Sequence, residues 1–455
     1  MTRTEYLILG AGLSGLSASF HIGHERCLIL EKNDFPFGLV HSYCSNDYTW
    51  DLGPHVSFTK NEYVKNLFSK NVGGDFHEFG VNVGNYFKGQ WVDHPVQVNL
   101  FQIPEPLRSR CVESFLETVG ISDNVEIANY REWLDKSLGK VITDNFVAPY
   151  TRKYWTTEPE NLGVDWIGSR VFKPTIEAVI NGANGNPVKN GHYISVIRYP
   201  KSGGFQSFAK AFSIGANILT NRKAVKVDTK KRIVVCEDST TYSYDKLIVT
   251  IPLPEFVRTI AGLEPSVTNA AEKLACTQLL LINVEVPHTV DRPEHWFYVY
   301  DEDKLSTRIT FTEKLSGSNA PNGRSGIQVE VYFSRYRPYK GNSEEIAKKV
   351  VYELLEMGLI ESEAIARECV VSTRWVEFAN IIFDHARKES LECIFDSLAP
   401  LGLARRSTDL DATTDWENPG KLKDGNVFLL GRFGEWKYYW SDDSVLCGKE
   451  ISESL

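Results

Sequence analysis

The N-terminal segment places a glycine-rich turn directly after a short apolar strand, and this order restricts the possible folds more than any other feature. Residues 6–9 are Tyr-Leu-Ile-Leu, as in a buried parallel strand, and residues 10–15 are Gly-Ala-Gly-Leu-Ser-Gly. In this spacing Gly10 permits a tight turn, Gly12 lets a diphosphate approach the backbone, and Gly15 lets the next helix pack closely on the strand. A diphosphate would lie on the first N–H groups of that helix, where the dipole favours negative charge. The segment therefore predicts a dinucleotide-binding βαβ unit.

A second strand follows at the distance that such a unit requires. Residues 27–30 are Cys-Leu-Ile-Leu, and Glu31 comes sixteen residues after Gly15. An acidic side chain at this place accepts hydrogen bonds from the hydroxyls of an adenosine ribose. A tight strand–helix turn without a ligand is the alternative. The ordered set of strand, glycines, helix, second strand and acid favours the dinucleotide.

Later segments favour FAD over NAD as this dinucleotide. The chain has Gly38-Leu39 where many FAD enzymes have a glycine pair, and Asp51-Leu52-Gly53-Pro54-His55 is similar to the segment that passes the flavin ring in several flavoproteins. Near the C-terminus a buried strand runs into Gly431-Arg432, and a helix is predicted to begin near Ser444, as in flavoproteins whose last strand and helix return to the cofactor. The predicted FAD contacts are Gly10, Gly12, Leu13, Ser14, Gly15, Glu31, Lys32, Gly38, Leu39, Gly53, Pro54, His55, Val225, Gly431, Arg432, Asp443 and Ser444.

The rest of the chain predicts an α/β fold with a discontinuous cofactor domain. Apolar residues recur at helical spacing in 107–118 and 129–138, whereas strand patterns dominate 279–333. We expect three parts: a Rossmann-type FAD-binding domain of residues 1–88, 196–270 and 415–455, a mainly helical insertion at 89–195, and an antiparallel β-sheet substrate domain at 271–414.

Composition disfavours several classes of function. The formal net charge is −9 without a concentrated basic tract, so nucleic acid is not expected as a partner. No stretch approaches the roughly eighteen apolar residues of a membrane helix, and the first residues lack the order of a signal peptide. The eight cysteines show no metal-ligand spacing, so we expect free thiols in a cytoplasmic protein and no metal. The sequence leaves oligomerisation open.

Several motifs occur in the order seen in one flavoprotein family. They are Gly53-Pro54-His55, Trp91-x-x-His94-Pro95 with Gln97 and Asn99, Pro149-Tyr150-x-x-Lys153-Tyr154-Trp155, Trp166-x-x-x-Arg170, Arg198-Tyr199-Pro200-x-x-Gly203-Gly204, Trp296-Phe297-Tyr298, Thr307-Arg308-Ile309-Thr310 and Gly431-Arg432-Phe433-Gly434-x-Trp436-Lys437-Tyr438. In this ordered set the chain resembles the eukaryotic-type branch of the UDP-galactopyranose mutases, FAD proteins related to protoporphyrinogen oxidases and amine oxidases. The motifs span nearly the whole chain.

The resemblance implies a pyranose–furanose isomerase that acts on a nucleotide-diphosphate sugar. In the family, N5 of the reduced flavin attacks the anomeric carbon, UDP leaves, and the opened sugar recloses at a different ring size. This implies a catalytic place for His55 beside the flavin, and for Arg170 and Arg308 on the diphosphate, which suits the guanidinium fork. The implied substrate contacts are Gln97, Asn99, Trp155, Tyr298 and Tyr438. Surface ion pairs for the arginines and ordinary core positions for the others are the alternative interpretation.

The chain departs from the family pattern at two places. A tyrosine–proline pair of the mutases is replaced by Asn380-Ile381, and the stretch after Tyr438 is two residues shorter and carries Asp442-Asp443. Two carboxylates repel a diphosphate, so an FAD-dependent oxidoreductase that accepts hydride from an amine, alcohol or sugar remains an alternative. A binding protein with a degenerate flavin site is a third hypothesis, disfavoured by the intact glycines and Glu31. No second G-x-G-x-x-G motif occurs, so NADPH would act only as a transient reductant.

Overall fold

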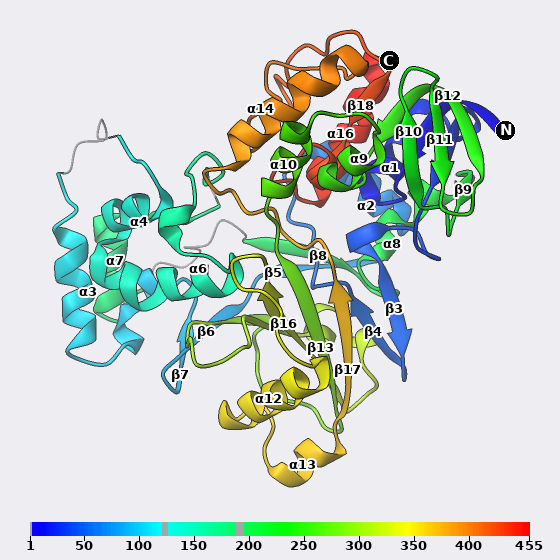
Figure 1. Ribbon diagram of the computed structural model, residues 1–455. Coiled ribbons are helices and arrows are strands. Elements are labelled where there is room, and N and C mark those ends of the chain that lie inside the picture. Colours follow the sequence, from blue (N-terminus) through cyan, green and yellow to red (C-terminus); the bar gives the residue numbers. More distant parts are fainter. Residues whose placement is uncertain (1, 121–125, 169, 188–194) are drawn as a thin grey trace.

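The computed structural model describes residues 2–120, 126–168, 170–187 and 195–455. These residues form two seven-stranded sheets, two small two-stranded sheets and a group of helices at one side (Figure 1). The α/β class predicted from the sequence is confirmed.

The first sheet carries the predicted βαβ unit. Its strands run in the order β10-β11-β12-β1-β2-β9, and β18 also pairs with β12. They are β1 (Thr2–Leu9), β2 (Cys27–Leu30), β9 (Ile218–Leu219), β10 (Ala224–Asp228), β11 (Ile233–Cys236), β12 (Thr241–Val249) and β18 (Val427–Leu429). The parallel register places Leu9, Val249 and Leu429 side by side, so the chain leaves β1, β12 and β18 at the same edge of the sheet. In open α/β sheets ligands bind outside this edge.

Two helices pack against each other beside this sheet. They are α1 (Leu13–Ile22), which follows the glycine-rich turn, and α16 (Ser441–Ser454) at the C-terminus. Ser17 Oγ donates a hydrogen bond to the Val445 carbonyl oxygen at 2.7 Å. A Cβ on Gly448 would lie 2.5 Å from the Ala18 nitrogen, so this crossing requires glycine. Further helices around the sheet are α2 (Glu62–Asn71), α8 (Gln206–Ala209), α9 (Leu253–Thr259), α10 (Pro265–Lys273), α14 (Arg387–Leu398) and α15 (Gly431–Gly434).

The second sheet lies below the first in Figure 1 and has the order β17-β13-β16-β15-β14-β6-β7. Its strands are β6 (Val83–Phe87), β7 (Gln90–Asp93), β13 (Gln278–Val286), β14 (Trp296–Val299), β15 (Arg308–Phe311), β16 (Ser325–Phe333) and β17 (Val370–Val376). Neighbouring strands are antiparallel except β14 and β6, which are parallel. Helices α11 (Thr312–Leu315), α12 (Ser343–Glu356) and α13 (Glu363–Glu368) belong to the same part of the chain.

Side chains alternate between the two faces of the second sheet. In β16, Val329 and Val331 pack with Val350 of α12 in one apolar cluster. Glu330 and Tyr332, the residues that alternate with them, line a cavity on the opposite face. Since successive side chains of a strand point to opposite faces, this two-residue period directs polar groups into the cavity.

Residues of the helical insertion line the side of this cavity. Figure 1 draws most of this insertion in cyan, beside the second sheet. Its helices are α3 (Leu107–Leu116), α4 (Tyr130–Leu138), α5 (Lys140–Ile142), α6 (Ala148–Tyr154) and α7 (Ile176–Ala183). Asn129 caps α4 by accepting from the Glu132 backbone N–H at 3.0 Å, and Thr175 caps α7 in the same way. The small sheets pair β3 (Ser42–Ser45) with β4 (Tyr48–Asp51) and β5 (Phe76–Gly80) with β8 (Val196–Pro200).

Three features of the fold differ from the sequence expectation. The substrate sheet is not purely antiparallel, because β6 joins it in parallel to β14. Since β6 lies within residues 1–88, we propose that the domain boundary precedes Val83. Helix α16 begins at Ser441 rather than near Ser444, which places both aspartates in its first turn. The strand β17 was not predicted, because its exposed pattern lacks the apolar alternation of a half-buried strand.

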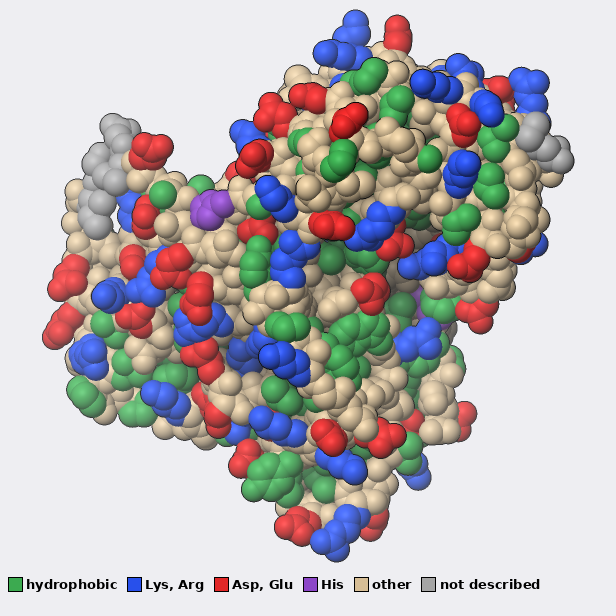
Figure 2. Space-filling model, viewed as in Figure 1, with side chains coloured by type: hydrophobic (Ala, Val, Ile, Leu, Met, Phe, Trp, Pro, Cys, Tyr) green, Lys and Arg blue, Asp and Glu red, His purple; other side chains and the backbone are tan. Residues whose placement is uncertain are grey.

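The surface shows no concentration of one charge on the face drawn in Figure 2, where Lys, Arg, Asp and Glu side chains are interspersed. No helix within the described residues is long and apolar enough to cross a membrane.

Candidate active site

A cavity of about 640 Å³ opens where β1 runs into α1. The glycines at this edge adopt conformations or contacts that a side chain would disturb. Gly10 has φ +102° and Gly431 has φ +80°, and a Cβ on Gly431 would lie 2.4 Å from Ser14 Oγ. A Cβ on Gly12, in contrast, would meet no described atom within 4 Å. This open space beside the start of α1 fits the diphosphate of a dinucleotide.

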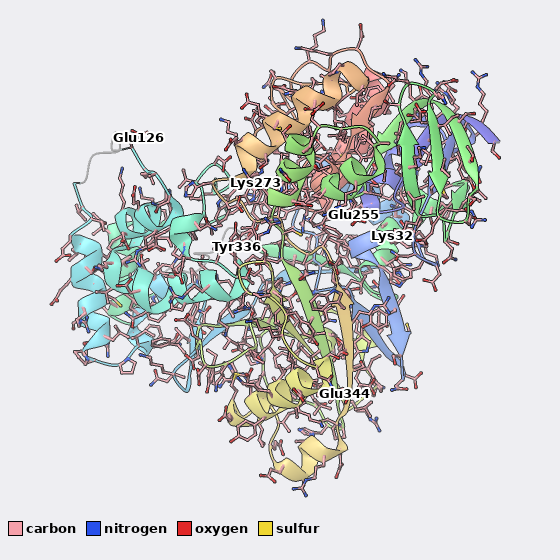
Figure 3. All side chains as sticks on the ribbon, in the orientation of Figure 1. Lys32, Glu126, Glu255, Lys273, Tyr336 and Glu344 are labelled. Carbon is pink, nitrogen blue, oxygen red and sulfur yellow. The ribbon has the colours of Figure 1, made fainter. Side chains whose placement is uncertain are left out.

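Glu31 lies at the end of β2 and lines the same cavity. Its Oε2 accepts from the Ala11 N–H at 2.8 Å and its Oε1 from the Asn33 N–H at 2.9 Å. Each carboxylate oxygen keeps a second acceptor position, so the same group can also accept from ribose hydroxyls. Lys32 and Glu255, labelled in Figure 3, lie on the wall of this cavity as well.

Most of the predicted cofactor residues line this cavity. They are Gly10, Gly12, Leu13, Ser14, Glu31, Lys32, Gly38, Leu39, His55, Val225, Gly431, Arg432 and Ser444. Gly15 lies behind it, where a Cβ would come within 2.1 Å of the Gly10 carbonyl oxygen. Gly53 and Pro54 line a second cavity instead.

Asp443 is not among the residues that line either cavity, and its predicted contact with the cofactor stays a prediction. Its Oδ2 accepts from the Trp440 backbone N–H at 2.8 Å, and its Oδ1 accepts from Trp416 Nε1 at 2.7 Å. The carboxylate therefore caps the first turn of α16. Burial and the neighbouring Asp442 raise the pKa of Asp443 to about 6.

The second cavity, of about 350 Å³, lies between the polar face of the second sheet and the helical insertion. Of the predicted substrate and catalytic residues it is lined by His55, Gln97, Trp155, Arg170, Tyr298, Arg308 and Tyr438. Asn99 is not among its lining residues, because its side chain turns back and donates to the Pro95 carbonyl oxygen at 3.0 Å. The side chain of Asn99 thus supports this turn, and its predicted contact with substrate stays a prediction.

The two cavities share part of their walls, which we call the junction. The junction residues line both cavities and are Leu39, Leu52, His55, Val376, Arg432, Trp440 and Ser441. A cofactor in the first cavity and a substrate in the second can therefore meet at the junction.

His55 stands at the junction as a neutral imidazole. Its Nδ1–H donates to the Gly53 carbonyl oxygen at 2.7 Å, which leaves Nε2 as an acceptor. Burial, together with the charges of Arg432 and Arg308, lowers the pKa of His55 to about 4.

Arg308 and Glu330 form a charged pair on the wall of the second cavity. The guanidinium reaches both carboxylate oxygens, with distances of 2.7 Å from Nε and 2.6 Å from Nη2. Tyr332 also donates its hydroxyl to Glu330 at 3.0 Å. Burial disfavours the charge of Arg308, but the Glu330 carboxylate outweighs this cost and holds the pKa of Arg308 well above its ordinary value.

Arg170 is held by aromatic rings and a backbone carbonyl. The centre of its guanidinium lies 4.6 Å from the ring centroid of Tyr438 and 4.5 Å from that of Trp440. Nη2 donates to the Tyr438 carbonyl oxygen at 3.1 Å, and Nε is buried without a hydrogen-bond partner among the described residues. Such an orphan donor costs about 1–3 kcal/mol, which an arriving anion would recover after a small movement.

Tyrosines that the sequence analysis did not assign to the site also line the second cavity. They are Tyr130, Tyr150, Tyr154, Tyr300 and Tyr332. Burial raises the pKa of each, so all five are neutral hydroxyls at neutral pH. Glu330 was missed too, although its register opposite Arg308 in adjacent strands is a signal that strand alignment would have offered.

A dinucleotide cavity at the edge of a Rossmann-type sheet, joined to a substrate cavity over a second sheet, defines a flavin-dependent enzyme, and the family comparison agrees. The pattern of the family described as "Flavin containing amine oxidoreductase" matches residues 13–432, and the chain belongs to this family. Within this family, the chain is similar to proteins named UDP-galactopyranose mutase.

Two comparisons show this similarity. A "Probable UDP-galactopyranose mutase" of Klebsiella pneumoniae is 26% identical over 173 residues, which is 36% of this chain and 44% of that protein. The match thus spans less than half the length of this curated relative. The crystal structure of a reduced UDP-galactopyranose mutase aligns with a TM-score of 0.85 at 22% identity, covering 99% of this chain and 95% of that one.

The fold is shared more widely. A putrescine oxidase bound to putrescine aligns with a TM-score of 0.60 at 12% identity, covering 99% of this chain and 98% of that one. The fold alone therefore does not distinguish an isomerase from an oxidase.

Proposed function

We propose that the protein is an FAD-dependent enzyme acting on a nucleotide-diphosphate sugar, as a pyranose–furanose isomerase of the UDP-galactopyranose mutase type. The observation that carries the proposal is the charge of the substrate cavity. Arg170, Arg308 and Arg432 line it, and among its described lining residues Glu330 is the only carboxylate. With His55 neutral, the cavity is positive and favours an anionic substrate.

The position of these charges supports a phosphate bonded to the reacting carbon. Arg432 belongs to the junction, and Arg170 packs on Trp440, another junction residue. The anion would therefore lie close to the point where cofactor and substrate meet. A glycosyl diphosphate has this arrangement, because its leaving phosphate is attached to the anomeric carbon. A protonated amine in the same place would be repelled.

The other lining residues suit the remaining parts of such a substrate. Trp155 offers a large aromatic face for a base, and Gln97 offers an amide at the same cavity. The neutral tyrosine hydroxyls can donate to phosphate and sugar oxygens. Bound in the first cavity in its reduced form, FAD would supply a nucleophilic nitrogen at the junction. Nε2 of His55 would then be a hydrogen-bond acceptor beside the flavin nitrogen that gains or loses a proton.

An oxidoreductase that accepts hydride from an amine, alcohol or sugar is the second candidate. The observation that favours it is Asn380, which lines the cavity where the resemblance expects a tyrosine. The other argument for it, the Asp442–Asp443 pair, loses force because neither aspartate lines the substrate cavity and Asp443 caps α16.

The two candidates differ in what changes the flavin spectrum. Oxidised, FAD-loaded protein is mixed without oxygen with UDP-galactose, UDP, and a panel of amines, alcohols and free sugars. We expect UDP and UDP-galactose to perturb the absorbance without bleaching it. Bleaching by any panel compound, with recovery in air, would favour the oxidoreductase. A flavin absorbance spectrum that does not change when UDP is added would contradict the proposal.

The cellular setting follows from the same proposal. An isomerase that needs reduced flavin requires an external reductant. NADPH is the candidate, and it would bind at the junction only transiently. All eight cysteines are free, which supports a reducing cytoplasm as its location.

A further inference from the structure

Arg170 differs from the other two arginines of the substrate cavity in what holds it. Arg308 is bonded to the Glu330 carboxylate, and Arg432 donates to the carbonyl oxygens of Tyr439 and Ala379. Arg170 also donates to carbonyl oxygens, those of Tyr438 and Trp166, but its guanidinium lies in addition in the corner between the rings of Tyr438 and Trp440, whose centroids are 6.4 Å apart. Stacking on aromatic rings orients a guanidinium without neutralising it.

Trp440 is itself held by contacts with residues other than Arg170. Its backbone N–H donates to Asp443 Oδ2 at 2.8 Å, and its carbonyl accepts from Ser444 N at 3.1 Å. The indole meets Phe58 edge to face at a centroid distance of 4.8 Å. Trp440 is thus held by the first turn of α16. Through the Trp440 ring, this helix turn also holds Arg170.

We propose that Trp440 is the positioning residue that holds Arg170 for the substrate's anionic group, and that it restricts the cavity to substrates with a phosphate beside the reacting carbon. The inference rests on the proposed function and deepens it. Because Trp440 lines both cavities, an anion on Arg170 lies next to the junction. Arg170 forms no ion pair with a described carboxylate, in contrast to Arg308, although its charge favours the ionised form of the nearby Asp443.

The test compares two ligands on matched variants of the FAD-loaded protein. UDP and uridine are titrated into wild type, Trp440→Leu and Trp440→Phe, with the flavin absorbance as readout and the FAD content measured for each variant. Arg292 lies over the ring of Trp91 at 4.4 Å outside both cavities, so Trp91→Leu breaks a comparable stack as a control. A cation–π contact that is partly shielded from water changes affinity by about tenfold.

We expect Trp440→Leu to weaken UDP binding about tenfold and Trp440→Phe about threefold, with uridine and the Trp91→Leu control within about twofold of wild type. In Arg170→Ala, adding Trp440→Leu should weaken UDP binding no further. If Trp440→Leu does not retain FAD, the Trp440→Phe comparison carries the test.

Equal weakening of UDP and uridine, or additive losses in the double variant, would overturn the inference, because either result means that Trp440 acts without Arg170. If wild type binds no UDP, the proposed function fails and inorganic pyrophosphate becomes the probe. Pyrophosphate binding that depends on Trp440 would still support the inference, and its absence or independence of Trp440 would overturn it.

Discussion

Arg308 and Glu330 are direct cross-strand neighbours in β15 and β16, and their side chains join through two hydrogen bonds of 2.7 and 2.6 Å on the wall of the substrate cavity. The two members differ in exposure: the Glu330 side chain is 1% exposed and that of Arg308 is 22% exposed. Water in the cavity can therefore solvate the guanidinium but not the carboxylate.

This asymmetry predicts unequal costs of breaking the pair. Arg308→Ala leaves a buried carboxylate without its partner and should lower the free energy of unfolding by about 3 kcal/mol. Glu330→Gln leaves a guanidinium that water reaches, and should cost about 1 kcal/mol. Urea unfolding of the FAD-loaded variants measures both values. Equal costs, or a larger cost for Glu330→Gln, would contradict the assignment of Glu330 as the buried member.

The histidine at the junction predicts a pH dependence of stability. The folded pKa of His55 is lowered to about 4 from an unfolded value near 6.5, so the unfolded chain binds more protons between these values. The contribution of neutral His55 is present above pH 6.5 and is lost as the pH falls towards 4. Between pH 7 and 4.5 wild type should lose about 2 kcal/mol more than His55→Gln.

The measurement is urea unfolding of both proteins across this range. His385→Gln serves as the control because His385 is exposed, and it should follow wild type. Parallel curves for wild type and His55→Gln would mean that His55 is protonated as easily in the folded protein as in the unfolded chain.

Substitution of two glycines in the first turn should cause two different defects, one in stability and one in FAD binding. A Cβ on Gly15 would lie 2.1 Å from the Gly10 carbonyl oxygen, so Gly15→Ala should destabilise the FAD-free protein by about 1–3 kcal/mol. A Cβ on Gly12 meets no described atom within 4 Å but enters the space assigned to the diphosphate. Gly12→Ala should leave the FAD-free protein as stable as wild type and weaken FAD binding about 10- to 100-fold.

Unfolding of the FAD-free variants and FAD titration separate the two effects. Unchanged FAD affinity in Gly12→Ala would show that the cofactor does not approach this turn.

The sequence predicted the parts of the structure whose signals are local. The strand, glycines and Glu31 of the first βαβ unit follow each other within a short stretch of the chain. The same order of a strand followed by a glycine predicts β18 and Gly431. The pairing of β6 with β14 joins residues far apart in the chain, and no local pattern encodes it.

The candidate site shows the same division. Arg170 and Arg308 were predicted as site residues from motifs. The partners that orient each guanidinium were not predicted. Glu330 reaches Arg308 through strand register, and Trp440 reaches Arg170 across the fold. The hydrogen bond of Asp443 to the Trp440 backbone was not predicted, because it depends on where α16 begins, and the predicted start lay three residues too late.

The central claim is that the reduced protein isomerises a nucleotide-diphosphate sugar. FAD-loaded protein is reduced with dithionite without oxygen, given UDP-galactopyranose, and analysed by chromatography for UDP-galactofuranose, with the oxidised protein and Arg170→Ala as controls. The account predicts furanose product from the reduced wild type, none from the oxidised protein, and at least about tenfold less from Arg170→Ala. Equal product with oxidised and reduced protein, or no product from reduced protein that binds UDP-galactopyranose, would contradict it.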